Sequence, residues 1–381
     1  MSREKSLVRI KKPKNLNTIF GLPAKSYTDE NFWKKECNTV LSNGWLFVGF
    51  VHEFKKPGDV IPILIADKPV LLVKDNNNKI TAFHNVCSHR CLKLVDKKKN
   101  VGKIIRCPYH SWSYDLEGKL KAAPHIGGID QHQPKGFNFS DHGLKKIKIH
   151  VWHDWIFINF NGKAKKFEDY AKPLIKKFND IDLTKLKYAA TLDFGKINTN
   201  WKFLIENFIE PYHVQFVHKS TTNQPLKDHY TVVDGICYGS GVDVKEEDTK
   251  NSKALSVTSR YLSLFPNFII GTYFPNQVGV YLNVPIAPGV TSQKRIIYTT
   301  DGKHMGKEEA DMVKNIWWSV HKEDHEMCER LQEGRSSPAS EEGGLLSPVW
   351  EKGVQAFQKL VVDSTMKSKK ITKRKKNVKR N

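Results

Sequence analysis

The sequence predicts an α+β protein of two domains, with a small antiparallel β domain in the N-terminal half and a larger α+β domain after it. At 381 residues the chain is too long for one small domain. Short apolar runs separated by turn signals fill residues 45–160, which is typical of antiparallel strands. Beyond residue 160, segments with helical periodicity alternate with a strand-rich stretch.

The first expected element is a helix that Thr28, Asp29 and Glu30 cap. Its apolar positions keep one face: Trp33, Cys37, Val40 and Leu41. Because this face needs a partner, we assign residues 1–44 to an N-terminal helical segment that packs on the larger domain.

The β domain is placed at residues 45–160. Strands are expected where apolar runs are bounded by turn sequences such as KPGD and DNNN: at 45–51, 70–73 and 80–84. The stretch VWHDWIFINF, residues 151–160, closes this domain before a lysine-rich, helix-prone stretch begins.

The larger domain is placed at residues 161–363. Helices are expected at 201–217 and 307–331, and residues 255–300 are strand-rich, so this half is α+β. No internal repeat is visible.

The formal net charge of +22 raises the question of a nucleic-acid partner. Nine of the positive charges lie in the tail between Lys367 and Arg380, which contains no acid. We therefore predict a disordered basic tail over 364–381, because like charges repel and the tail offers little to bury. No nucleic-acid-reading motif sits beside it, so we expect a solvated tail or a docking surface for an acidic protein, and a nucleic-acid-binding arm is the less favoured alternative.

The six cysteines are too few and too scattered for a disulfide framework. The first residues contain no apolar segment of signal-peptide length, and no run of about 18 apolar residues occurs. A cytoplasmic protein with no membrane contact is expected.

Two Cys and two His stand out in the β domain. Cys87-x-His89 and Cys107-x-x-His110 form two short loops seventeen residues apart. Four such ligands could hold a structural zinc ion. One Cys and one His in each loop instead match a Rieske [2Fe–2S] centre, where two thiolates hold one iron and two imidazoles the other. Zinc stays open as the alternative, but the order within each pair favours iron.

A second candidate site lies in NWKFLIENFIEPYHVQFVH, residues 200–218. Glu210 and His213, three apart, would share a helix face, whereas His213 and His218, five apart, would diverge by about 140° on a regular helix. Both imidazoles reach one metal only if the helix ends or bulges between them. Two ordinary surface histidines near a helix end are the alternative.

The string CSHRCLKL…CPYHSWSYDLEGKL resembles the Rieske domains of aromatic-ring-hydroxylating oxygenases, although Cys91 and Ser111 stand where that family usually has Gly. From about Leu22 to about Val362 the chain is similar to the α subunit of Rieske non-haem iron oxygenases. The resemblance implies a Rieske β domain followed by a helix-grip-type catalytic domain that holds mononuclear Fe(II) through two His and one carboxylate. Within HKEDHEMCERLQEGRSS the match falls on Asp324, and the neighbouring acids Glu323 and Glu326 are alternatives.

The resemblance also implies a role for Glu210. In the family an acid at this position links a Rieske histidine, here His110, to an iron-ligating histidine of the next subunit, here His213. The chain would then act as a homotrimer, with a separate NAD(P)H-dependent reductase or ferredoxin supplying electrons and O₂ as co-substrate. The sequence shows no flavin or nicotinamide fingerprint of its own.

ENFIEPYHVQFVH and EDHEMCERLQEG are most similar to the branch of choline, glycine betaine and carnitine monooxygenases. This implies hydroxylation or oxidative N-demethylation of a small quaternary ammonium compound. Oxygenation of an aromatic acid, and a Rieske electron carrier without oxygenase activity, are the alternatives. A trimethylammonium group favours an aromatic cage, and aromatic side chains with strand spacing occur in one stretch: Phe265, Phe268, Tyr273, Phe274 and Tyr281. Such spacing is also typical of a core.

Overall fold

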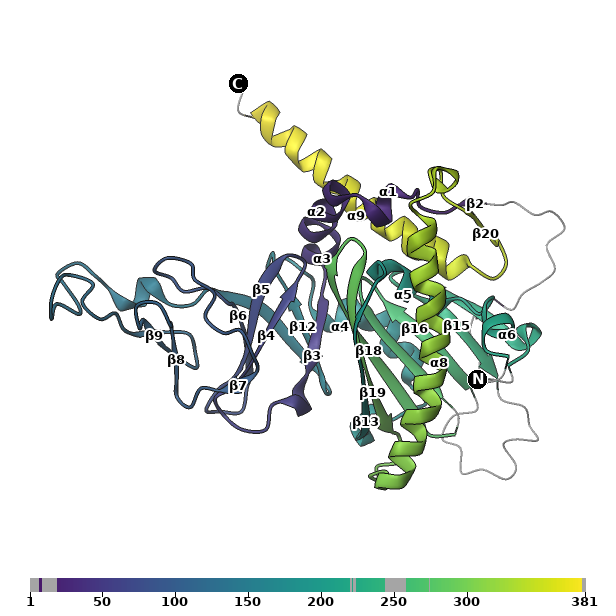
Figure 1. Ribbon diagram of the computed structural model, residues 1–381, viewed down its shortest axis with the longest axis horizontal. Coiled ribbons are helices and arrows are strands. Elements are labelled where there is room, and N and C mark those ends of the chain that lie inside the picture. Colours follow the sequence, from purple (N-terminus) through teal and green to yellow (C-terminus); the bar gives the residue numbers. More distant parts are fainter. Residues whose placement is uncertain are drawn as a thin grey trace. The chain divides into compact units, whose positions relative to one another are not determined.

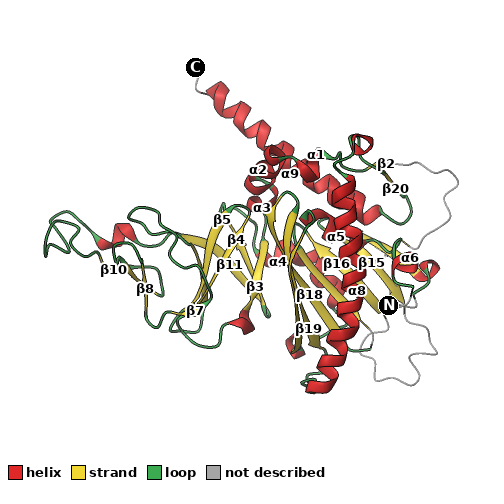
Figure 2. Ribbon diagram, in the orientation of Figure 1, coloured by secondary structure: helices red, strands yellow, loops and turns green. Residues whose placement is uncertain are grey.

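The computed structural model describes residues 7–8, 19–219, 221, 224–243, 258–273 and 275–378. The chain divides into two compact units. One unit is Trp45–Ala164, which exceeds the β domain expected from the sequence by a few residues; the other combines Met1–Gly44 with Lys165–Asn381. No helix in the described part of the chain is both long and apolar enough to cross a bilayer. Figures 1 and 2 show the elements of each unit.

The unit Trp45–Ala164 consists of two antiparallel sheets. The larger has the strand order β3-β12-β11-β6-β5-β4-β7, and the smaller the order β10-β9-β8. The strands are β3 (Leu46–Phe50), β4 (Asp59–Ile65), β5 (Lys68–Lys74), β6 (Ile80–His84), β7 (Lys99–Asn100), β8 (Ile104–Arg106), β9 (Ser113–Asp115), β10 (Leu120–Ala122), β11 (Lys146–Trp152) and β12 (Trp155–Asn159).

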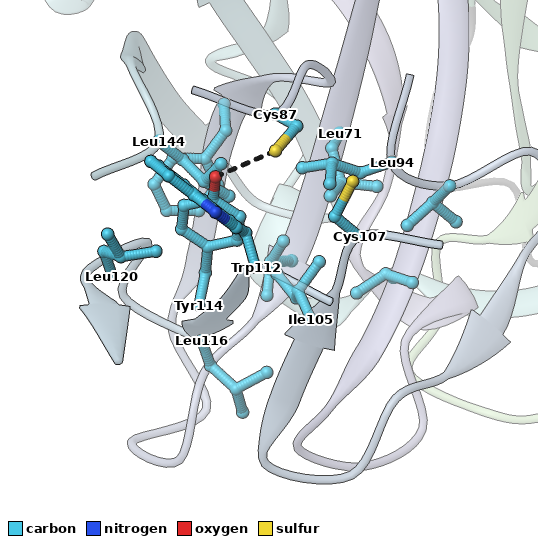
Figure 3. Packing of buried hydrophobic residues seen from close by; sticks show 14 of the residues in the cluster. Leu71, Cys87, Leu94, Ile105, Cys107, Trp112, Tyr114, Leu116, Leu120 and Leu144 are labelled. Carbon is cyan, nitrogen blue, oxygen red and sulfur yellow. Dashed lines mark hydrogen bonds between the residues drawn. The ribbon is translucent and has the colours of Figure 1, made fainter. Parts of the chain in front are cut away.

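One hydrophobic cluster in this unit joins both sheets. It contains side chains from β4 and β5 of the larger sheet and from β8 and β9 of the smaller one. Cys87 and Cys107 belong to the same cluster and are almost fully buried (Figure 3). The loops that carry them are therefore anchored in the core, although they lie outside the strands.

The second unit is built on an eight-stranded antiparallel sheet with the order β1-β14-β15-β16-β17-β18-β19-β13. Its strands are β1 (Leu7–Val8), β13 (Lys187–Ile197), β14 (His229–Asp234), β15 (Cys237–Asp243), β16 (Thr258–Leu264), β17 (Phe268–Tyr273), β18 (Gln277–Ala287) and β19 (Val290–Thr299). Short strands β2 (Ile19–Phe20) and β20 (Leu345–Leu346) pair separately.

The helices of this unit pack around the sheet, and the long helix α8 runs across it (Figure 1). They are α1 (Lys25–Thr28), α2 (Glu30–Asn38), α3 (Val40–Asn43), α4 (Phe167–Ile175), α5 (Trp201–Ile209), α6 (Val214–Val217), α8 (Lys307–Gly334) and α9 (Lys352–Val378). Asp29 is the N-cap of α2, since its side chain accepts the Phe32 N–H at 2.6 Å. The sequence predicts a cap that begins with Thr28. The structure shows that Asp29 is the N-cap and that Thr28 ends α1.

Helix α9 differs from the sequence prediction. Disorder was expected from residue 364, but the backbone is helical to Val378; residues 379–381 lie outside the described part. The helix is anchored by Val354, Phe357 and Val361, which are buried at helical spacing. Lysine and arginine are good helix formers, so a helix that already has an anchored first half continues into a basic segment.

A buried polar network ties the N-terminal segment to α5. Lys202 Nζ lies 2.9 and 3.0 Å from the two carboxylate oxygens of Glu36, and both side chains are almost fully buried. Beside this pair, Glu206 Oε1 accepts hydrogen bonds from the Tyr27 hydroxyl at 2.8 Å and from Gln358 Nε2 at 3.1 Å. Residues 19–44 thus belong structurally to the larger unit, although the β domain separates them from it in sequence.

Candidate functional site

The two Cys/His loops of the β unit have the same backbone form. In the first, Cys87 N–H donates to Leu92 O and Cys91 N–H donates to Cys87 O. In the second, Cys107 N–H donates to Trp112 O and Ser111 N–H donates to Cys107 O. Each turn therefore closes around its cysteine.

Cys91 and Ser111 occupy the same position in the two turns and have φ values of 56° and 57°. This left-handed conformation favours glycine, which has no Cβ to clash with the backbone. The sequence departs from the family's glycines at these two positions, and the structure shows that both turns still adopt the conformation that a glycine would favour.

The side chains of these loops converge. The sulfur atoms of Cys87 and Cys107 lie near each other (Figure 3), and burial together with the Cys107 thiol raises the pKa of Cys87. The rings of His89 and His110 are 4.7 Å apart, and Trp112 stacks on His89. The buried Nδ1 atom of His89 has no hydrogen-bond partner among the described residues.

This donor set fits a Rieske [2Fe–2S] cluster. An orphaned buried ring nitrogen beside two buried thiols is expensive unless a metal uses the nitrogen's lone pair and stabilises the thiolates. Tyr114 supports the set, because its hydroxyl lies 3.2 Å from Cys87 Sγ and accepts the Ser88 N–H at 3.0 Å. Hydrogen bonds to cluster sulfurs tune the reduction potential of such centres.

The second site begins where α5 ends. The prediction of one helix over 201–217 is wrong, because α5 stops at Ile209 and Glu210 is extended, with φ −107° and ψ 137°. Pro211 explains the break, since a residue before proline avoids the helical region. After the break, His213 and His218 are the N-cap and C-cap residues of the one-turn helix α6. Glu210 and His213 therefore lie in the non-helical segment between α5 and α6, and not on one face of a helix.

This break and helix α8 bring three side chains together. Asp324 Oδ1 lies 3.0 Å from His218 Nε2 and 3.5 Å from His213 Nε2. The three potential ligand atoms lie within 4.8 Å of one another. Asp324 Oδ1 is buried and has no hydrogen bond of good geometry among the described residues. A buried carboxylate oxygen facing two ring nitrogens fits a mononuclear 2-His-1-carboxylate iron site.

Both imidazoles are oriented from behind by carboxylates. Glu210 Oε1 lies 2.6 Å from His213 Nδ1, and Glu323 Oε2 lies 2.7 Å from His218 Nδ1. Thr221 Oγ1 donates to the same Glu323 oxygen at 2.7 Å. Because a carboxylate accepts, each Nδ1 donates its proton to the acid behind it, and each Nε2 is the nitrogen that faces Asp324 and would bind a metal. In the sequence, Glu323 is a candidate only as an alternative ligand to Asp324. The structure instead places its carboxylate against His218 Nδ1, a contact that its position next to Asp324 does not predict.

The charges of the triad are strongly coupled. Burial opposes ionisation of Asp324, but the neighbouring imidazoles of His213 and His218 outweigh it and hold the carboxyl pKa well below its usual value. Burial likewise opposes protonation of His213, yet Glu210 and Asp324 raise its pKa to about 10. The site therefore favours a positive charge among its three side chains, which a bound divalent cation supplies.

A cavity of about 450 Å³ opens beside the triad. Five aromatic side chains line it: Phe208, Tyr261, Tyr273, Tyr281 and Trp317. Carboxylates also line it, and none of the described lining residues is Lys or Arg: the acids are Glu210, Asp228, Asp243 and Asp324. The wall is thus aromatic and acidic, which suits a cation, although three of its rings, those of Tyr273, Tyr281 and Trp317, also face the buried guanidinium of Arg295.

Only some of the aromatic residues proposed from the sequence line the cavity. Tyr273 and Tyr281 line the cavity, and Phe274 lies outside the described residues. Phe265 and Phe268 are buried and do not belong to the cavity wall. Phe208, Tyr261 and Trp317 come from three different elements, so no single sequence pattern could have grouped them.

A further group, His125, Asp130 and His132, lies on the surface of the β unit. His125 Nδ1 accepts the Asp130 N–H and His132 Nδ1 accepts the His125 N–H, each at 2.9 Å. A neutral imidazole whose Nδ1 accepts is protonated at Nε2. The Nδ1 atoms of both rings are therefore occupied by hydrogen bonds within the loop, and we do not assign this group as a metal site.

Comparison with known proteins identifies both units. Residues 44–133 match the model of the Rieske [2Fe-2S] domain. Residues 181–367 match the model of the ring hydroxylating alpha subunit catalytic domain. The two matches include all four Cys/His residues of the loops and all three residues of the triad.

Several curated proteins are similar in sequence. The large oxygenase component of salicylate 5-hydroxylase from Ralstonia sp is 32% identical over 209 residues, 52% of this chain and 48% of that protein. Chloroplastic choline monooxygenase of Arabidopsis thaliana is 28% identical over 345 residues, 84% of this chain and 78% of that protein. The glycine betaine monooxygenase oxygenase subunit of Chromohalobacter salexigens is 31% identical over 54% of this chain and 45% of its own length. The chain thus spans about half of two of these relatives and over three quarters of the third.

Solved structures share the fold. The quaternary ammonium Rieske monooxygenase CntA in complex with L-carnitine superposes with a TM-score of 0.75 at 21% identity, covering 91% of this chain and 96% of that one. Naphthalene 1,2-dioxygenase with bound indole gives a TM-score of 0.70 at 18% identity, covering 90% and 92%.

Proposed function

Because the chain belongs to the Rieske non-haem iron oxygenases, we propose that it uses O₂ and electrons from a separate reductase to hydroxylate or oxidatively N-demethylate a small quaternary ammonium compound. The observation that carries this proposal is the triad of His213, His218 and Asp324 at the wall of an aromatic and acidic cavity. Substrates of the glycine betaine, carnitine or choline type fit this wall, since their permanent positive charge favours π faces and carboxylates.

We assign the metal ligands as follows. Cys87, Cys107, His89 and His110 hold the [2Fe–2S] cluster, and His213, His218 and Asp324 hold mononuclear Fe(II). When bound, the cluster would supply single electrons and the mononuclear iron would supply the chemistry that activates O₂ beside the substrate. The protein's part is to hold two imidazoles with Nε2 free, to keep Asp324 ionised, and to place the substrate cation against the aromatic wall.

Glu210 is proposed as the link between the two centres. One of its oxygens holds His213 Nδ1, and the other accepts the backbone N–H groups of Tyr212 and His213. We propose that His110 of a neighbouring subunit also approaches Glu210 in a homotrimer. The structure of a quaternary ammonium Rieske monooxygenase has given insights into inter-subunit electron transfer in that protein, which supports such an arrangement here.

Replacing Glu210 tests this link. Glu210→Gln keeps an oxygen acceptor for His213, so both metal centres should be retained, while electron transfer between them slows. Stopped-flow reoxidation of the cluster, in the presence of substrate and O₂, measures the coupling. A cluster reoxidation rate equal to that of the wild type would show that Glu210 is not the link.

The electron donor is proposed to be an acidic ferredoxin or reductase that binds next to the cluster. Between Arg90 and Arg106 the chain carries seven basic residues and one acid, Asp96, and all eight are exposed. Arg90 follows the ligand His89 and Arg106 precedes the ligand Cys107, so this basic segment joins the two ligand loops. We further propose a cytoplasmic location, because none of the six cysteines forms a disulfide.

An anaerobic single turnover tests the function. The protein is loaded with Fe(II), reduced chemically and exposed to O₂ with glycine betaine, carnitine, choline and several aromatic acids in separate reactions. Formaldehyde or a hydroxylated product from one quaternary ammonium compound is the expected result, read by formaldehyde assay and mass spectrometry. A product only from an aromatic acid would keep the oxygenase and overturn the substrate class. Cluster oxidation without any product would favour a Rieske electron carrier.

Oxygenation of an aromatic acid is the second candidate. The five aromatic side chains of the wall would also hold a flat ring. A carboxylate on that ring would favour a Lys or Arg partner, and the described lining residues include neither. The charge of the cavity wall therefore favours a cationic substrate. By the same argument it favours choline over glycine betaine and carnitine, which also carry a carboxylate.

A further inference from the structure

Arg295 is a buried charge that the proposed ligand set does not use. It lies on β19 and is completely inaccessible to solvent. Its Nε and Nη2 atoms have no hydrogen-bond partner among the described residues. Burying a guanidinium is costly unless its surroundings compensate for the lost water, so this arginine requires an explanation.

The surroundings of Arg295 are specific to a cation. Its Cζ atom lies 3.7 Å from the ring centre of Trp317, 4.7 Å from that of Tyr273 and 5.0 Å from that of Tyr281. A Cβ atom at Gly279 would lie 2.8 Å from both Nε and Nη2, so any other residue at this position would displace the guanidinium from where it lies. The pocket around Arg295 is therefore shaped for the group that occupies it.

The hydrogen bond that Arg295 makes determines the state of His321 on α8. Arg295 Nη1 lies 3.0 Å from His321 Nε2. Because a guanidinium only donates, His321 Nε2 must accept, and the ring carries its proton on Nδ1. That Nδ1 lies 4.0 Å from Asp324 Oδ2. The other oxygen of Asp324, Oδ1, is the one that faces His213 and His218.

We propose that Arg295 is a positioning residue of the triad, which acts through His321 to hold Asp324 with its Oδ1 turned toward His213 and His218. The inference rests on the proposed function, because it assumes that the triad binds Fe(II). It completes a pattern in which every side chain of the triad has a partner behind it. Glu210 and Glu323 are hydrogen-bonded to His213 and His218, whereas His321 acts on Asp324 electrostatically, across 4.0 Å.

The test compares the full-length protein, with its cluster loaded, to Arg295→Gln, which removes the charge and keeps an N–H donor. We expect Arg295→Gln to bind Fe(II) at the triad about 10–100-fold more weakly, because partners behind metal ligands typically have effects of this size. Anaerobic Fe(II) titration measures the affinity. The electron paramagnetic resonance spectrum of the protein with Fe(II) and nitric oxide reports the ligand geometry, and its rhombicity should change.

Two variants serve as controls. Arg295→Lys keeps a buried cation and a donor to His321, so it should restore part of the affinity. Arg260→Gln removes an arginine that pairs with Asp180 and does not line the cavity, and it should leave affinity and spectrum unchanged. Should Arg295→Gln not fold, judged by its melting temperature and cluster absorption, His321→Gln breaks the same chain and should show the same loss.

Wild-type affinity and an unchanged spectrum in Arg295→Gln, or in His321→Gln in its place, would overturn the inference and leave the proposed function intact. A wild-type protein that binds no Fe(II) beyond its cluster would instead overturn the proposed function, and this inference with it.

Discussion

At the scale of single residues, the two imidazoles of the triad are held in the same way from different parts of the chain. Glu210 precedes His213 by three residues, whereas Glu323 reaches His218 from α8, across 105 positions of sequence. The first contact is local, and its spacing could be read from the sequence. The second depends on how α8 packs, so no spacing rule could have assigned Glu323 to His218.

We expect Glu323→Ala to weaken Fe(II) binding at the triad about 10–100-fold, because His218 loses the acceptor that fixes its tautomer. Glu323→Gln should cost less, since its amide oxygen still accepts from Nδ1. Iron content after dialysis against a chelator measures the effect. Glu326→Ala is the matched control, since Glu326 is exposed and its ion pair is with Arg330 on the same helix. Equal iron retention in Glu323→Ala and Glu326→Ala would contradict the role of Glu323.

Glu206 makes the stability of the larger unit depend on pH. Burial raises the pKa of this carboxyl from 4.5 to about 7, so the folded chain holds its proton more tightly than the unfolded chain does. The stability that the protonated group contributes is therefore present below about pH 4.5 and is lost as the pH rises to about 7. Glu206→Gln still accepts from Tyr27 and Gln358 and does not ionise.

Glu206→Gln should therefore gain stability relative to the wild type as the pH rises from about 4.5 to about 7, with a constant difference above. Urea denaturation at a series of pH values measures the difference. A difference that does not change with pH would show that Glu206 does not titrate in this range.

At the scale of elements, the break between α5 and α6 positions the mononuclear site. Pro211 stops α5 so that His213 and His218 flank a single helical turn instead of diverging on a continuous helix. The sequence prediction required a break between His213 and His218, whereas the structure has it at Glu210, before both histidines, although the proline that follows is visible in the sequence. The apolar residues before and after Pro211 have helical spacing, so the hydrophobic pattern alone predicts one continuous helix.

Pro211→Ala should let α5 continue past Glu210, because it removes the steric restriction on that residue. We expect the variant to lose most of the iron at the triad and to keep its [2Fe–2S] cluster, since the cluster loops belong to the other unit. Iron analysis together with the visible absorption of the cluster separates the two sites. Full iron content at both sites would show that other contacts, such as the carboxylates behind the imidazoles, hold the break.

The cluster loops, by contrast, could be predicted from the sequence in detail. Their four ligands lie in two short segments, and each loop is closed by its own backbone hydrogen bonds. The triad combines residues from α6 and α8, and the cavity wall combines α5, the sheet and α8, so these groups depend on tertiary packing. Asp324 was found through a family resemblance because an acid-rich helix offers no local signal that singles out one carboxylate. Arg295 gave no signal, since an arginine in a strand usually faces solvent.

At the scale of the whole molecule, charge is expected to control the electron supply. Opposite charges on the donor protein and the basic segment 90–106 would speed association, and salt would screen them. We expect the triple variant Lys97→Glu, Lys98→Glu and Lys99→Glu to slow reduction of the cluster by the physiological donor at low salt by at least about tenfold. Stopped-flow experiments at increasing ionic strength measure the rate at which the donor reduces the cluster.

The matched control changes Lys172 and Lys176, two exposed lysines of the other unit, to Glu. This control should leave the rate nearly unchanged, and chemical reduction by dithionite should be equal in all proteins. If reduction by the donor shows no salt dependence and no effect of the triple variant, the donor does not use this basic segment.

The buried pair of Glu36 and Lys202 also has a consequence for biosynthesis. The two residues are 166 positions apart, with the whole β unit between them. At about 5–20 residues per second, the ribosome needs on the order of 8–33 s to add Lys202 after Glu36. During that interval the β unit can complete its own sheets. The apolar face of α2 stays exposed, because the part of the larger unit that covers it has not yet been synthesised. The newly made N-terminal segment thus exposes apolar surface during translation, which a chaperone could cover.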